Sequence, residues 1–140
     1  MLFNSTISLR QRFPQYRGYK LEIRFKETMI IVNANTIGRV FNSSPETFLK
    51  QPEVLKYMYD YGKYRLHPQH TRDLKDRYHY SVSRNYSQNG DLRETYYFEK
   101  NLAVRYATWL NLDFGVWLFH YIDDIISEIG YIKWEDKLHY

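Results

Sequence analysis

The sequence predicts one small α+β domain in which two β-hairpins frame a run of helices. Three observations support this fold class. Residues 21–25 and 78–86 alternate apolar and polar side chains with the two-residue period of strands, and residues 29–32 form a short apolar run. Residues 33–62 contain helix start signals and apolar residues at helical spacing. After residue 99, apolar side chains recur at i, i+3, i+4 and i+7, which is typical of amphipathic helices.

Length and composition narrow the class of protein. A chain of 140 residues, 44% of them apolar, is long enough for one domain with a real core. The absence of cysteine excludes disulfides, thiolate metal sites and a cysteine nucleophile. The N-terminal residues contain no apolar run of signal-peptide length, and no segment approaches the length of a membrane span. We therefore expect no membrane association.

The charge is unevenly divided along the chain. Residues 1–112 contain 18 Lys and Arg against 10 Asp and Glu, a net charge of +8. Residues 113–140 contain 2 Lys and Arg against 6 Asp and Glu, a net charge of −4. A basic body with an acidic C-terminal segment indicates a polyanionic partner for the body, although a merely solvated basic surface fits the same numbers.

Residues 1–20 are interpreted as a basic N-terminal arm before the domain proper, which is predicted over residues 21–130. The alternating residues 21–25 and the apolar residues 29–32 form a predicted hairpin. Asn33 follows it as a helix N-cap. Because apolar residues then recur at helical spacing up to Phe41, the sequence predicts a short helix there.

A second short helix follows after a brief break at residues 42–44. Ser44 is a predicted N-cap and Pro45 occupies the first helical position, both strong start signals. A helix, a tight break and a second short helix are the outline of a helix-turn-helix. Pro52 restarts the chain as a third helix, for which Gly62 is the predicted stop.

The polar residues 63–76 give no clear prediction. Residues 78–86 and 92–98 form the second predicted hairpin, closed by an Asn89–Gly90 turn. Its tip is rich in charge and amide groups, so its shape is that of a wing. The predicted fold is thus a small winged helix-turn-helix-like domain.

Two amphipathic helices complete the prediction. The first starts near Glu99, and Asn111 breaks or caps it. The second places Phe114, Trp117, Leu118, Tyr121, Ile122, Ile125 and Ile129 on one face, with Gly130 as its stop. Phe119 falls off that face and is predicted to be exposed. Residues 131–140 are interpreted as a separate aromatic tail.

Residues 32–49 and 95–117 together resemble two blocks of the KilA-N domain, a DNA-binding module of phages and large DNA viruses. Residues 32–41 (VNANTIGRVF) and 44–49 (SPETFL) are similar to the first strand, helix start and short helix of that family. Residues 95–117 (TYYFEKNLAVRYATWLNLDFGVW) are similar to its closing block. The likeness covers about residues 21–129, with Phe98 where the family usually has a histidine.

The resemblance implies a fold related to winged-helix and APSES-type domains. It also implies a phage or prophage origin, a location in the bacterial host cytoplasm, and binding of double-stranded DNA in gene regulation or host takeover. An alternative function stays open: the same scaffold could bind and inhibit a host defence or regulatory protein. Neither function requires a cofactor or a catalytic residue, and the oligomeric state is not predicted.

The candidate DNA-binding residues come from the helix-turn-helix and from the wing. Arginine and lysine can reach phosphates or guanine, and hydroxyl and amide groups can reach phosphates or base edges. In the helix-turn-helix the candidates are Arg39, Ser43, Thr47, Lys50 and Gln51. In the wing they are Arg84, Asn85, Gln88, Asn89 and Arg93. Each of these residues also suits an ordinary solvated surface.

Metal and catalytic sites are not predicted. His67 and His70 flank a proline that makes joint coordination awkward, and no third ligand is evident. Asp123 and Asp124 are adjacent on a helix, so their side chains diverge, and no nucleophile or base accompanies them. The sequence therefore favours a binding protein over an enzyme.

Overall fold

The computed structural model describes residues 11–26, 29–65 and 79–138 of the chain, as a mixed α+β structure. Its largest element is a five-stranded antiparallel sheet with the strand order β1-β4-β5-β7-β6. In that order the strands are Gln11–Arg12, Ile23–Lys26, Met29–Asn33, Leu92–Glu99 and Tyr80–Tyr86. The strands β2 (Gln15–Tyr16) and β3 (Tyr19–Lys20) form a separate two-stranded hairpin.

Both predicted hairpins are confirmed. β4 pairs with β5 in a register that sets Ile23 opposite Val32, and both side chains are fully buried. β6 pairs with β7 over seven residue pairs, and the hairpin turns through Gly90, which has a positive φ of 84°. Alternation predicted β4 and β6, and an apolar run predicted β5, in which Ile30 and Val32 are buried.

The predicted N-terminal arm is wrong for residues 11–20. β1 adds an edge strand to the sheet, and the β2–β3 hairpin turns through Arg17 and Gly18, both with positive φ as in a type I′ turn. The amide of Leu21 donates to the carbonyl of Pro14, which anchors this hairpin. These strands are two residues long and largely polar, so they leave no periodic signal. Arg10 lies outside the described residues.

The predicted helix starts are confirmed. The helices are α2 (Ala34–Arg39), α3 (Pro45–Leu49), α4 (Pro52–Arg65), α5 (Lys100–Leu110) and α6 (Leu112–Leu138). Three N-cap side chains accept backbone N–H groups of the first turn that they cap, namely Asn33, Ser44 and Glu99.

The two predicted glycine stops are wrong. α4 continues past Gly62 to Arg65, and α6 continues past Gly130 to Leu138. A glycine inside a helix costs only about 1 kcal/mol, which the surrounding helix can offset. The backbone of residues 131–138 is therefore part of α6 and not a separate tail. The remainder of the unassigned segment, residues 66–76, lies outside the described residues.

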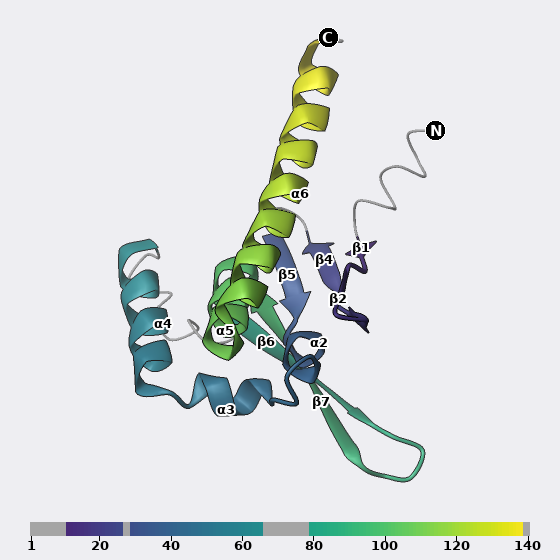
Figure 1. Cartoon of the computed structure of the whole chain (residues 1–140), viewed down its shortest axis with the longest axis vertical. Helices are drawn as coiled ribbons and strands as arrows, with labels where there is room; N and C mark the ends of the chain where they lie inside the picture. Colours follow the sequence, from purple (N-terminus) through teal and green to yellow (C-terminus); the bar gives the residue numbers. More distant parts are fainter. Residues whose placement is uncertain (1–10, 27–28, 66–78, 139–140) are drawn as a thin grey trace.

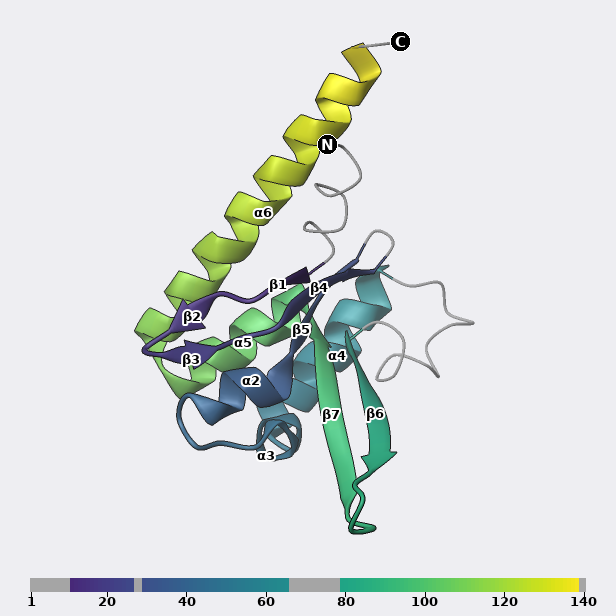
Figure 2. The same cartoon turned by 90° about the vertical axis from the view of Figure 1, so that its right-hand side faces the viewer.

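The core lies between the sheet and the C-terminal helices. α5 packs against β5 and β7 on one side and against α6 on the other. Figures 1 and 2 show α6 crossing this layer and projecting well beyond the rest of the domain. Within the described residues, no helix is both long and apolar enough to cross a membrane.

The predicted inner face of α6 is largely confirmed. Phe114, Leu118, Ile122 and Ile125 are buried, and Phe119 is exposed as predicted. Trp117 and Tyr121 are only half-buried at the rim of the core, and the side chain of Ile129 lies outside the described residues. The ring of Trp117 lies against Tyr16, with the ring centroids 5.0 Å apart. The β2–β3 hairpin, which the sequence did not predict, therefore supplies part of its packing.

The unequal burial of these side chains predicts that their truncation to alanine lowers the free energy of unfolding by unequal amounts. Phe114→Ala should lower the free energy of unfolding by about 3–5 kcal/mol, because the ring is fully buried and stacks on Tyr16. Trp117→Ala should cost clearly less, and the exposed Phe119→Ala should change it by no more than about 0.5 kcal/mol. Urea unfolding of the three variants measures this order. An equal loss for Phe119→Ala would contradict the assignment of the buried face.

Candidate nucleic-acid interface

The two segments with predicted DNA-binding residues lie on one side of the molecule. In Figures 1 and 2, α3 and the tip of the β6–β7 hairpin both point away from the projecting end of α6. Phe48 of α3 also contacts Phe98 of β7, with the ring centroids 6.1 Å apart. The two short helices α2 and α3, called the helix pair below, and the β6–β7 hairpin therefore form one side of the domain.

The start of α2 ties the helix pair to this hairpin. β5 pairs with β7 only as far as Asn33, which is opposite Tyr97. Beyond that point the side chain of Asn35 takes over, because its Nδ2 donates to the carbonyl of Glu94 at 3.0 Å. The backbone N–H of Tyr96 donates to Oδ1 of the same side chain at 2.8 Å. One amide thus continues the hydrogen-bond ladder and holds the hairpin against α2.

A second polar group supports the cap of α2. The carboxylate of Glu22 accepts hydrogen bonds from Gln11, Arg24 and Asn33, at distances between 2.9 and 3.1 Å. Burial alone would raise the pKa of this carboxyl group. The hydrogen bonds from Asn33 and Arg24, the charge of Arg24 and the hydrogen bond from Gln11 outweigh burial and lower the pKa. Asn33 is thereby oriented to cap α2.

The turn between α2 and α3 is packed against α5. The hydroxyl of the fully buried Tyr106 donates to Oγ of Ser43 at 2.9 Å, and burial raises the pKa of Tyr106. A Cβ atom at Gly38 would lie only 2.2 Å from the carbonyl oxygen of Ser43, so this close approach requires glycine. Ser43 therefore differs from the other candidates: it is half-buried, and its hydroxyl is used inside the fold.

The other candidates of the helix pair fall into two groups. Lys50 pairs with Glu46 at 3.4 Å, and the amide of Gln51 donates to the carbonyl of Thr47 at 3.1 Å. Arg39 and the side chain of Thr47 are exposed and have no polar partner in the described part of the chain. Of the two cations in this segment, Arg39 alone is therefore not balanced by a described carboxylate.

The hairpin divides its cations between two faces. Arg84 lies opposite Glu94, and the two form an ion pair at 2.9 Å. Tyr96 lies on that same face. Its pKa is raised by burial and then by the negative charges of Glu46 and Glu94. Because Glu46 belongs to α3, this face of the hairpin is the one that adjoins the helix pair.

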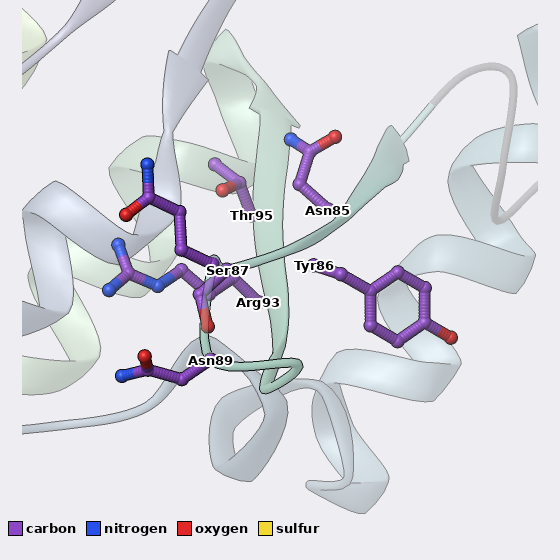
Figure 3. A pocket seen from close by; sticks show the side chains of 7 residues that line it. Asn85, Tyr86, Ser87, Asn89, Arg93 and Thr95 are labelled. Carbon is purple, nitrogen blue, oxygen red and sulfur yellow. The ribbon is translucent and has the colours of Figure 1, made fainter.

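The opposite face of the hairpin carries the remaining candidates around a hollow of about 530 Å³ (Figure 3). Arg93 lies opposite Asn85 in the strand register, and Arg93 has no acidic partner among the described residues. The complete lining consists of Asn85, Tyr86, Ser87, Gln88, Asn89, Arg93 and Thr95. Four of the five predicted wing residues are thus brought together, while Arg84 is separated from them.

Sequence reasoning missed several exposed residues on this side. Tyr86 is 75% exposed, and its ring points away from Arg93 (Figure 3). Tyr86 lies opposite the exposed Leu92 in the strand register, so these two residues place apolar side chains together at the tip of the hairpin. The alternation of the strand, extended to its last residue, would have placed Tyr86 there. Arg17 was included only as part of an arm, yet its guanidinium lies over Phe41, next to the α2–α3 turn.

Metal ligands do not gather among the residues that the structure describes, where no group of three His, Cys, Asp or Glu side chains could hold an ion. His67 and His70 lie outside those residues. His79 is buried, and its Nε2 is 2.8 Å from the carbonyl oxygen of Met58. Burial lowers the pKa of His79 although this hydrogen bond opposes the shift.

The bridging amide of Asn35 yields a first prediction for this site. Asn35→Ala removes the partners of two backbone groups and should lower the free energy of unfolding by about 1–3 kcal/mol. The amide hydrogen of Tyr96 should exchange faster in the variant, which hydrogen-exchange NMR can measure. The exposed Gln88→Ala is the matched control and should change neither quantity. Unchanged exchange at Tyr96 would contradict the bridging role.

The carboxylate of Glu22 yields a pH prediction. Its pKa is lower in the folded chain than in the unfolded chain, where the pKa of a glutamate is about 4.3. Its contribution to stability is therefore fully present above that value and is lost as the pH falls through the folded pKa. Glu22→Gln should be less stable than the parent at pH 7, and the difference should shrink at acid pH. A stability difference between Glu22→Gln and the parent that does not change with pH would contradict this prediction.

Three comparisons of this chain with known proteins found no match. No protein-family model matches this chain, and neither the curated proteins nor the solved structures that were searched contain a match to it. The resemblance of residues 32–49 and 95–117 to the KilA-N domain therefore stays a prediction. Inferences about function rest on the residues and geometry of α2, α3 and the β6–β7 hairpin.

Proposed function

We propose that this chain binds double-stranded DNA as a winged helix-turn-helix-like module of the KilA-N type. In this proposal α3 faces the major groove and the β6–β7 hairpin contacts the adjacent backbone or minor groove. The observation that supports it best is that both segments project from one side of the molecule (Figures 1 and 2). The acidic α6 projects away from that side, so its charge is kept at a distance from a bound polyanion.

The helix pair offers DNA two cations, of which one has no described carboxylate partner and the other forms an exposed ion pair. Arg39 is exposed and available for a phosphate. Lys50 is engaged with Glu46, but the two side chains are 73% and 55% exposed, and a pair of this kind contributes little to stability. A phosphate can therefore replace Glu46 as the partner of Lys50 at small cost. Ser43 is assigned a supporting role instead, because Tyr106 already uses its hydroxyl.

The hairpin offers a cation together with amide groups. Arg93 lies beside Asn85 and Asn89 at the hollow of Figure 3, an arrangement that suits phosphate oxygens. The exposed pair of Tyr86 and Leu92 presents apolar side chains at the tip, and minor-groove binders insert such side chains between base steps. We assign affinity mainly to Arg93 and local DNA deformation to the apolar pair.

The test of the proposal is duplex binding at several salt concentrations. If about five phosphates are neutralised, log K should fall against log salt with a slope of about −4.5. Mobility shift or fluorescence anisotropy with a random duplex at low salt provides the first measurement. Selection from a random DNA library then provides a preferred site. No binding at about 50 mM salt would contradict the proposal, because nonspecific phosphate contacts are strongest at low salt.

The ion pair between Arg84 and Glu94 allows a sharper prediction. Arg93→Ala should weaken binding to all sequences alike and reduce the salt slope by about 1. Arg84→Ala should have a smaller effect, because Glu94 already balances that charge. Glu94→Gln should strengthen binding, by roughly two- to fivefold if the pair has the usual value of up to about 1 kcal/mol. Equal losses for the two arginine variants would contradict the division of the hairpin into two faces.

A further inference from the structure

α6 carries a second apolar stripe, about 125° around the helix from its buried face. Its residues are large and substantially exposed: Leu112 by 67%, Val116 by 48%, Phe119 by 53% and Ile126 by 42%. At 100° per residue these four positions fall within an arc of about 80°. Such a stripe resembles the seam of a helix that packs against another helix.

The described fold does not cover this stripe. α5 packs on the buried side of α6, and the ring of Phe119 contacts only the neighbouring His120 among the described aromatic residues. A single exposed apolar residue is ordinary on a protein surface, but four in register over about 21 Å of helix are not. Their arrangement therefore points to a partner that covers them.

Charge narrows the choice of partner. Asp123 lies within the stripe, and Asp113 and Asp124 lie about 60–80° beyond one edge of it, all three exposed. Residues 112–128 contain no lysine or arginine. A nucleic acid would be repelled by this surface. A second copy would bring two acidic stripes together without any compensating cation from the same segment, which is unfavourable.

We infer that the stripe of Leu112, Val116, Phe119 and Ile126 is a docking surface for a basic amphipathic helix of a partner protein. Apolar side chains of that helix at i, i+3, i+4 and i+7 contact the stripe. Lysine and arginine at its flanks face Asp113, Asp123 and Asp124. The surface is separate from α3 and the hairpin tip, so the inference does not depend on DNA binding.

Peptide display with the full chain as target tests this inference. The library consists of helical peptides of about 18 residues with an apolar stripe and randomised flanking positions. Phe119→Asp serves as the counter-target. Peptides enriched on the parent should have lysine or arginine at the flanks. Lack of enrichment over the counter-target, or enrichment of acidic flanks, would overturn the inference.

Binding of one enriched peptide, measured by fluorescence anisotropy, tests the individual residues. Phe119→Asp should weaken it at least tenfold, and the double charge reversal Asp123→Lys with Asp124→Lys should also weaken it. The matched control Leu55→Asp, at another exposed apolar position, on α4, should leave it unchanged. Circular dichroism shows whether each variant is folded. Equal weakening by the control would overturn the inference.

Two further measurements separate this inference from its rivals. Sedimentation of the parent chain should show a monomer. A dimer that Phe119→Asp abolishes would assign the stripe to a second copy of the chain and overturn the inference. Phe119→Asp should bind the random duplex like the parent. Loss of DNA binding in that variant, without loss of fold, would also overturn the separation of the two surfaces.

Discussion

The relation between the helix pair and the β6–β7 hairpin depends on the side-chain amide of Asn35. β5 ends at Asn33 because the chain turns there into α2, whereas β7 continues for several residues beyond its pairing with β5. The freed backbone groups at Glu94 and Tyr96 need a partner, and one amide supplies both a donor and an acceptor. Without that bridge, the outer part of the hairpin would lose a constraint on its position relative to α2.

Packing supplies the second constraint on this side of the molecule. The stacked rings of Phe48 and Tyr106 hold α3 against α5, with centroids 4.8 Å apart. The hydroxyl of Tyr106 then fixes Ser43, and the contact at Gly38 leaves no space for a larger residue. A DNA-binding module needs its helix and hairpin at a constant separation, because grooves and phosphates have a fixed spacing. Buried aromatic contacts and a bridging amide are suited to that requirement.

Electrostatics divides the molecule into two surfaces with different proposed partners. Arg39 and Arg93 lie on the side of α3 and the hairpin, where the remaining candidate cations are balanced by Glu46 and Glu94. The exposed stripe of α6 lies in a segment, residues 112–128, that contains acidic residues but no lysine or arginine. A polyanion and a basic helix would therefore select different surfaces.

The sequence alone determined the features that depend on neighbouring residues: the caps at Asn33 and Ser44, the two hairpins, and the buried and exposed faces of α6. A cap or an apolar period acts within a few residues, so the printed order of residues is enough to find it. Only the tertiary structure decided what depends on distant partners. Residues 11–20 form strands and a hairpin, and α4 and α6 continue past their glycines. Ser43 is hydrogen-bonded to Tyr106. Arg84 pairs with Glu94, whereas Arg93 has no described carboxylate partner. A side chain's availability for a ligand is set by what packs beside it in three dimensions, and for Ser43 that residue is 63 positions away.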